Sequence, residues 1–303
     1  MTYDIITVGG GPAGLTAAIY ARRANKSVLV IEKETFGGQI TFSPKVENIP
    51  GFTVLSGNEF AEKLVEQAVE QGADFESCEV LSIKENGGTK TVVTDSGEFE
   101  AKAVIISTGA RHRLLGAPRE DEFIGNGISF CAVCDGAFYK DKNVAVIGGG
   151  NSALQEALLL SEQCAKVTVV QNLDFLTGEK KLAEQLEAKA NTEVILGAVV
   201  EEFCGDGDLN GILIKKTSDG SVSKLSVDGV FVAIGLVPQN EPFSDVIELD
   251  GRGYAVSDEM CVTKTDGIFV AGDCRTKKIR QVTTAAADGA VAALAACDYI
   301  DGR

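Results

Sequence analysis

The sequence predicts an α/β fold with two Rossmann-like domains, each a three-layer structure of the dinucleotide-binding type. Two observations lead to this prediction. Residues 5–31 show a short apolar strand, a glycine-rich turn, a helix with apolar periodicity and a second apolar strand. Residues 143–171 repeat the same order of elements. Each stretch matches a β-α-β unit, so a chain of 303 residues containing both predicts two domains of ordinary size.

The first unit carries the glycine pattern of a dinucleotide-binding turn. Its strand at 5–8 is followed by Gly9, Gly11 and Gly14 in the spacing G-x-G-x-x-G, and a helix is expected over 13–24. The first glycine permits a tight turn, and the second lets a pyrophosphate approach the backbone. The third lets the helix pack on the strand, with helix N–H groups facing the phosphates.

Two side chains support the same prediction. Pro12 suits the first turn of the helix, where its missing N–H costs little. Glu32 follows the second strand, at 28–31, where a carboxylate can accept hydrogen bonds from ribose hydroxyls. The first unit is therefore predicted to bind a nucleotide cofactor.

The second unit repeats the backbone pattern but not the acidic side chain. Gly148, Gly150 and Ala153 occupy the three positions for small residues between two apolar strands. Gln171, after the second strand, is neutral, and no arginine follows it to bind a 2′-phosphate. A glycine turn can serve backbone packing without a ligand, so nicotinamide binding here stays one of two alternatives.

The rest of the chain contains strands, linkers and one further long helix. We expect a hairpin strand at 91–97, a strand at 101–110, linkers at 114–127 and 233–243, a strand entering a turn at 267–274 and a final Ala-rich helix at 283–300.

Charge and hydropathy exclude several classes of partner. The net charge of −16 argues against nucleic acid and anionic membranes, which carry charge of the same sign. No apolar run approaches the roughly 20 residues of a membrane span, and the N-terminal residues lack the basic start of a secretory signal. We therefore expect a cytoplasmic protein without a membrane or nucleic-acid partner.

Cys131 and Cys134 form the only close pair among eight cysteines. A zinc site needs about four nitrogen or sulfur ligands. With His112 as the only histidine and no second CxxC, we predict neither zinc nor an iron–sulfur cluster. Two reduced core cysteines and a redox disulfide are the remaining alternatives. The redox disulfide is favoured because both sulfurs can reach one short turn, and Asp135 follows directly as a candidate proton carrier.

With these features together, the sequence resembles the low-molecular-weight thioredoxin reductase family. The resemblance covers essentially the whole chain and rests on motifs in a fixed order. They are GGGPAG (9–14), FGGQI (36–40), VENIPGF (46–52), STGA (107–110), CAVCDG (131–136), GGGNSA (148–153), VFVAIGLVPQN (230–240), AGD (271–273) and RQVTTAAADG (280–289).

The resemblance implies that the second domain is inserted into the first. The FAD-binding domain would comprise residues 1–113 and 243–303, and the NAD(P)-binding-like domain, with the cysteine pair, residues 114–242. FAD is the implied cofactor and a homodimer the implied assembly. The implied FAD contacts are Gly9, Gly11, Pro12, Ala13, Gly14, Glu32, Lys33, Gly38, Gln39, Asn48, Val80, Thr108, Gly109, Gly272, Asp273, Arg280, Gln281 and Val282.

The resemblance also implies roles for the cysteine pair. Cys131, Cys134 and Asp135 would be catalytic: Cys134 would face the flavin, Cys131 would attack the disulfide of a thioredoxin-like partner, and Asp135 would act as the acid. Since one position of the pair cannot serve both flavin and partner, we expect the inserted domain to swing about its two linkers.

The electron donor is where the sequence departs from the family pattern. NADPH-dependent members carry a His-Arg-Arg stretch and a further Arg where this chain has QNLDFLTG, at 171–178. NAD(P)H is therefore a doubtful cofactor, and the ferredoxin-dependent branch of the family fits better. Four basic residues of the segment CRTKKIR, at 274–280, offer a docking patch for an acidic ferredoxin. NADH and NADPH are the alternative donors, and a flavin-bearing redox sensor without turnover is the alternative function.

Overall fold

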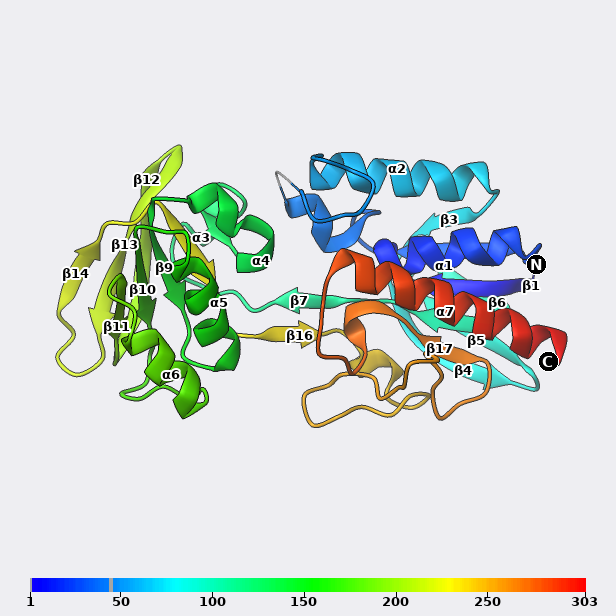
Figure 1. Cartoon of the computed structure of the whole chain (residues 1–303). Coiled ribbons are helices and arrows are strands. Elements are labelled where there is room, and N and C mark those ends of the chain that lie inside the picture. The colour runs from blue at the N-terminus through cyan, green and yellow to red at the C-terminus, as the bar shows by residue number, and fades with distance from the viewer. Residues whose placement is uncertain (1, 44–45) are drawn as a thin grey trace. The chain divides into compact units, whose positions relative to one another are not determined.

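A computed structural model describes residues 2–43 and 46–303. The chain divides into two compact units. Unit 1 contains Met1–Pro44, Ile49–Arg111 and Val237–Arg303, and unit 2 contains Lys45–Asn48 and His112–Leu236. The chain passes between the units within strands β7 (Ala110–His112) and near β16 (Leu236–Pro238), which pair with each other (Figure 1).

Unit 1 is built on a seven-stranded sheet in the order β3-β2-β1-β6-β5-β4, with β17 paired to β6. The strands β3, β2, β1, β6 and β17 are parallel, whereas β4 and β5 form an antiparallel extension. The bounds are β1 (Thr2–Val8), β2 (Val28–Glu32), β3 (Asp74–Ser77), β4 (Val80–Asn86), β5 (Thr89–Thr94), β6 (Gly97–Ile106) and β17 (Ile268–Val270).

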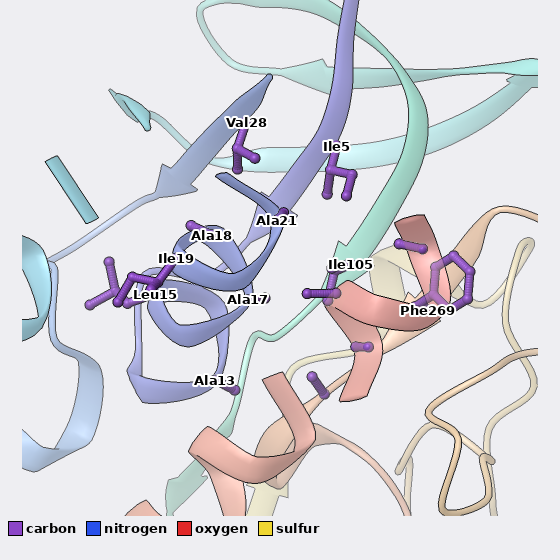
Figure 2. Close-up of a cluster of buried hydrophobic side chains, with 14 of the residues drawn as sticks. Ile5, Ala13, Leu15, Ala17, Ala18, Ile19, Ala21, Val28, Ile105 and Phe269 are labelled. Atoms are coloured by element: carbon purple, nitrogen blue, oxygen red, sulfur yellow. The ribbon is translucent and has the colours of Figure 1, made fainter. Parts of the chain in front are cut away.

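Helices cover one face of this sheet and bury its main core. They are α1 (Pro12–Arg23), α2 (Gly57–Glu70) and α7 (Val282–Asp301). The 3-10 helices of the unit are η1 (Gly38–Phe42), η3 (Glu241–Phe243) and η4 (Gly272–Cys274), and Phe243 of η3 belongs to the cluster on the opposite face. Alanines dominate the α1–α7 contact, which lets the two helices approach closely (Figure 2). Leu15 of α1, Ile105 of β6 and Phe269 of β17 belong to the same cluster. A second cluster covers the opposite face, which gives three layers.

Unit 2 has a fully parallel sheet in the order β11-β10-β9-β15-β8. Helices pack on one face, and an antiparallel sheet of β12, β13 and β14 covers the other. The bounds are α3 (Glu120–Phe123), β8 (Ile128–Ser129), α4 (Ala132–Asp135), η2 (Gly136–Tyr139), β9 (Asn143–Ile147), α5 (Asn151–Ser161), β10 (Lys166–Val170), α6 (Lys180–Glu187), β11 (Thr192–Ile195), β12 (Ala198–Asp206), β13 (Asp208–Lys216), β14 (Val222–Leu225) and β15 (Gly229–Val232).

The architecture confirms the predicted fold class: both units are α/β layers built around parallel strands. The expected linker at 114–127 is more ordered than predicted. It contains α3, and the carboxylate of Glu120 accepts the N–H groups of Leu115 and Gly116 at 2.9 and 2.7 Å. This buried carboxylate satisfies the two N–H groups of a backbone turn. The sequence pattern did not predict that turn.

Candidate functional site

The first glycine turn joins β1 to α1 at the carboxyl edge of the unit 1 sheet. Gly9 has φ +110°, a conformation that favours glycine. A Cβ on Gly9 would overlap the carbonyl oxygen of Ser107, which follows β6. A Cβ on Gly14 would overlap the carbonyl oxygen of Gly9 and lie 2.6 Å from Ser107 Oγ. The first and third glycines are therefore required by packing between α1, β1 and β6.

Gly11 differs because protein atoms leave space around it. A Cβ there would meet only Gly38 Cα at 3.9 Å and Gly37 O at 4.0 Å. Gly38 also has a positive φ of +68°, and a Cβ on it would lie 3.1 Å from Gly11 Cα. The two predicted residues thus form one glycine-lined edge, where α1 begins without a side-chain cap or an acidic residue in its first turn. Such an edge fits a pyrophosphate.

Glu32 reaches this turn from the end of β2. Its carboxylate accepts the N–H of Gly10 at 2.7 Å and the N–H of Glu34 at 2.9 Å. Burial raises the pKa of Glu32, while the Gly10 N–H acts in the opposite direction. Each carboxylate oxygen keeps a further lone pair, so Glu32 can still accept from ribose hydroxyls.

Two more predicted segments lie at the same sheet edge. Thr108 and Gly109 follow β6, and Gly272 and Asp273 follow β17, the strand next to β6. Asp273 Oδ1 is buried and has no hydrogen-bond partner in the described structure. Burial raises the pKa of Asp273 to about 6. A buried carboxyl oxygen without a partner fits the hydroxyl-bearing ribityl chain of FAD, which would supply the missing donor.

The start of α7 completes this group of residues. Gln281 is the N-cap residue of α7 and Val282 its first helical residue. Arg280 lies with its guanidinium 4.2 Å from the ring centroid of Tyr254 and donates to the carbonyl oxygen of Asp273 at 3.3 Å. The helix N-terminus gives this end a partial positive charge, which suits a group that becomes negative on reduction.

The other predicted FAD contacts are placed as follows. Pro12 and Ala13 begin α1, and Ala13 packs against Gly272, since a Cβ on that glycine would lie 2.9 Å from Ala13 Cβ. Val80 is buried at the start of β4, and Gln39 lies in η1. Lys33 pairs with Glu79 at 2.9 Å. Asn48 lies in the segment Lys45–Asn48, which belongs to unit 2.

The predicted basic docking patch at 274–280 is wrong. Arg275 and Lys277 have side chains only 11% and 8% exposed, because both bind the carboxylate of Asp288 on α7 at 2.8 Å. Asp288 also accepts the N–H of Gly272 at 3.0 Å. These cations therefore hold the turn after β17 against α7. With Arg280 on Tyr254, three of the four charges have partners inside unit 1.

The second glycine turn joins β9 to α5 in unit 2. Gly148 has φ +133°, and a Cβ on it would lie 2.6 Å from the carbonyl oxygen of Ala233. Gln171 is buried and packs on Gly149, where a Cβ would lie 2.5 Å from the Gln171 carboxamide carbon. Among the described residues that follow β10, 171–179 contain no lysine or arginine, and Lys180 is exposed at the start of α6.

Cys131 and Cys134 form a disulfide, so the alternative of two reduced core thiols is wrong for this state. Cys131 is the N-cap residue of α4, and its Sγ accepts the N–H of Cys134 at 3.2 Å. A hydrogen bond of this kind favours the thiolate of Cys131 after reduction. The other six cysteines are free thiols, and five of them are buried.

Asp135 directly follows Cys134 and is the last residue of α4. Its Oδ2 accepts the hydroxyl of Ser129 at 2.6 Å, whereas Oδ1 is buried without a partner. Burial raises the pKa of Asp135, which brings the carboxyl closer to the pH at which it can deliver a proton. His112 is unsuited to that task, because burial lowers its pKa to about 4 and its ring stacks on Phe130.

Residues 2–43 and 46–303 contain no group of three or more His, Cys, Asp or Glu side chains that could hold a metal ion. They also contain no helix that is both long and apolar enough to cross a membrane.

Two dinucleotide-binding-type units and a CxxC disulfide beside a carboxyl together define a disulfide oxidoreductase of the two-domain type. The sequence profile described as pyridine nucleotide-disulphide oxidoreductase matches residues 3–289. The chain therefore belongs to the pyridine nucleotide-disulphide oxidoreductase family and, within it, to the low-molecular-weight thioredoxin reductases.

The individual relatives agree with this family. The chain is 41% identical over 300 residues to a thioredoxin reductase of Listeria monocytogenes, covering 99% of this chain and 94% of the relative. It is 43% identical over 300 residues to a thioredoxin reductase of Treponema pallidum, covering 99% and 97%. The crystal structure of thioredoxin reductase from Streptococcus pyogenes aligns with a TM-score of 0.95 at 39% identity, covering 100% of this chain and 99% of that one.

These comparisons bear on the predicted electron donor. They confirm the family but do not support the ferredoxin-dependent branch. They also do not support the sequence-based doubt about NAD(P)H, because the matching family is named for pyridine nucleotides.

Proposed function

We propose that this protein is a flavoenzyme that transfers electrons from a pyridine nucleotide to the disulfide of a thioredoxin-like protein. The observation that carries the proposal is the Cys131–Cys134 disulfide at the start of α4, with Asp135 beside it. The names of the relatives supply the class of partner. The proposal includes a homodimer, which the family resemblance suggests, and a cytoplasmic location, which the sequence predicts.

Unit 1 would hold FAD at the residues collected on its sheet edge. The Gly9–Gly14 turn and Gly38 would hold the pyrophosphate, Glu32 the adenosine ribose, and Asp273 the ribityl chain. This assigns residues 1–113 and 243–303 to FAD binding and 114–242 to the redox disulfide. When bound, FAD would supply two-electron chemistry between a nicotinamide and a disulfide.

The cysteine pair would then carry the electrons to the partner. The Cys131–Cys134 bond takes up two electrons and two protons, and both residues become thiols. Cys131 gives its proton to the Asp135 carboxylate, and the Cys131 thiolate, favoured by the Cys134 N–H, attacks the partner's disulfide. This releases one partner thiolate, which takes that proton from Asp135. Cys134 next attacks Cys131 Sγ and gives up its own proton to the departing partner sulfur, which restores the internal disulfide and releases the second partner thiol.

A second donor, reduced ferredoxin, is favoured by one feature of unit 2. The described residues 171–179 carry no lysine or arginine for a 2′-phosphate, and Gln171 stands where NADH-binding turns carry a carboxylate. The partnered cations at 275–280 argue in the other direction. The donor is therefore tested separately from the disulfide chemistry.

Anaerobic bleaching of the bound flavin by NADPH, NADH and reduced ferredoxin in parallel tests the donor. We expect bleaching by a micromolar pyridine nucleotide, and bleaching by ferredoxin alone would overturn the donor assignment.

Cys131→Ser and Cys134→Ser should keep FAD and lose the reduction of thioredoxin. Retained turnover in both variants would contradict the role of the pair, and no turnover with any donor would favour a redox sensor.

A further inference from the structure

The described structure contains one carboxyl near the redox disulfide that the proposed chemistry does not use, Glu156 of α5. Residues three, four and seven apart share one face of a helix. Ala153, Ala157 and Leu160 lie on one such face and are fully buried in a cluster with Ala132, which is 2% exposed. Glu156 follows Ala153 by three residues and precedes Leu160 by four. It therefore lies on the face of α5 that packs against α4.

One oxygen of the Glu156 carboxyl is buried without a partner. Its Oε2 is inaccessible and has no hydrogen-bond partner in the described structure. Burial raises the pKa of Glu156 to about 7, while the backbone N–H of Ala132 acts in the opposite direction. Ala132 lies directly between Cys131 and Val133 in the CxxC turn. A carboxyl in an apolar cluster is costly, and a perturbed carboxyl next to reactive groups is a candidate for a functional role.

Among the described residues, the cluster around Glu156, α4 and η2 contain no lysine or arginine that could balance its charge. Asp135 on α4 and Tyr139 in η2 are the titratable groups on the elements that precede β9, and burial raises the pKa of both. Cys164, in the same cluster, has its pKa raised to about 11 by burial. From α6, the cluster receives Leu182 and Leu186. The charged residues of α6 are Lys180, Lys181, Glu184 and Glu187, all exposed.

The same short turn must stabilise a sulfur anion once the disulfide is reduced. Cys131 Sγ accepts the N–H of Cys134, and the N–H of the intervening Ala132 is close enough to Glu156 to lower its pKa. An ionised Glu156 would hold that N–H dipole and repel a second negative charge on the turn. A protonated Glu156 would leave the turn free to stabilise the thiolate.

We infer that Glu156 is a positioning residue for the redox pair: its buried carboxyl, packed against the Ala132 peptide, controls by its charge state how readily the Cys131 thiolate forms. The inference rests on the proposed function in one respect, that Cys131 is the attacking sulfur. The reactivity of the Cys131 thiol is measured on the chemically reduced enzyme, without an electron donor or a protein partner. Failure of thioredoxin turnover would therefore leave it testable.

The experiment measures alkylation of Cys131 in the holoenzyme. The protein is reduced with dithiothreitol, desalted anaerobically and treated with iodoacetamide between pH 5 and pH 9, and labelling of Cys131 is followed by mass spectrometry. For the wild type, we expect the rate to rise with pH in two steps, with an interruption near pH 7 where Glu156 loses its proton. For Glu156→Gln, we expect a single step. Its rate should equal that of the wild type at pH 5 and exceed it on the order of tenfold at pH 8.

Two further variants separate this effect from a loss of structure. Gln155→Glu adds a carboxylate to the exposed face of the same helix, where solvent screens it, and should change the rate by less than about twofold. Glu156→Asp should retain the two-step profile. A single-step profile in the wild type would overturn the inference even if Glu156→Gln failed to fold. An increase for Glu156→Gln of equal size at every pH would also overturn it, since loosened packing would not depend on pH.

Discussion

The two glycine turns of this chain are built alike in their backbones. Gly9 and Gly148 both have positive φ values, of +110° and +133°. Each leaves no space for a Cβ, because a carbonyl oxygen of the neighbouring strand end is in the way, from Ser107 in unit 1 and Ala233 in unit 2. The middle glycine of each G-G-G run also accepts hydrogen bonds through its carbonyl oxygen. Gly10 O accepts the N–H of Gly37 at 2.7 Å, and Gly149 O accepts the N–H groups of Thr177 and Gly178, both at 2.8 Å.

The turns differ in the side chain that meets the middle glycine. In unit 1 the Glu32 carboxylate accepts the N–H of Gly10, whereas in unit 2 the neutral Gln171 packs on Gly149 and donates to Phe175 O at 3.4 Å. The glycine spacing therefore reports how a helix packs on a parallel strand. The side chain after the second strand determines which ligand the turn suits.

Gly14→Ala should show the largest difference between the turns, because their third positions are not equivalent. The new Cβ overlaps the Gly9 carbonyl oxygen, so α1 must move, and we expect a loss of about 3 kcal/mol in the free energy of unfolding. Thermal unfolding and the flavin-to-protein absorbance ratio measure the effect. Ala153→Gly, the reciprocal control, should cost about 1 kcal/mol. Equal losses would show that the third positions are interchangeable.

Asp273→Asn should show the next effect, at the end of β17 beside the first turn. The pKa of Asp273 is about 6 in the folded protein against an ordinary 3.8, so the folded state keeps a proton that the unfolded state releases. The free energy of unfolding of flavin-free protein should therefore fall as pH rises from about 4 to about 6, by up to about 3 kcal/mol. Urea titrations at pH 4.5 and 7 measure this, and the fall should be smaller in the variant by about that amount, because Glu156, whose pKa is also raised, still contributes its own share. A wild type whose stability rises over this range would contradict the assignment.

Exchanging the two strand-end residues, Glu32 and Gln171, should have the smallest effect. It tests directly whether the side chain after the second strand determines which ligand each turn suits. Glu32→Gln removes a charged acceptor from the first turn and should weaken FAD binding by about 1.5 kcal/mol, or roughly tenfold in Kd. Gln171→Glu should lower the KM for NADH by a similar factor if the donor is a pyridine nucleotide. Fluorescence titration and steady-state kinetics provide the two values. Unchanged FAD affinity in Glu32→Gln would show that the carboxylate does not distinguish the turns.

Local patterns predicted most of the elements that surround the site. The helix expected over 13–24 is α1 at Pro12–Arg23, and the final helix expected at 283–300 is α7 at Val282–Asp301. Cys131 and Cys134 were paired correctly. These predictions succeed because glycine turns, apolar periodicity and close cysteines act over a few neighbouring residues.

Other features depend on residues far apart in sequence. The basic segment at 274–280 was expected to be exposed, but Asp288 binds Arg275 and Lys277 from a helix that begins after the segment. Glu156 was missed, although a carboxyl that interrupts the apolar face 153–160 was a visible indication. The inferred role of Glu156 in positioning the redox pair depends on Ala132, which lies 24 positions earlier and packs against that face.

The two β-α-β units, the redox pair and the family resemblance could all be predicted from the amino-acid sequence, because each depends on the spacing of neighbouring residues. Which charges face solvent and which carboxyls are buried depends on the folded chain. The free energy of a charge depends on the dielectric and the partners around it. Those surroundings are created when distant segments such as β17 and α7, or α4 and α5, pack together.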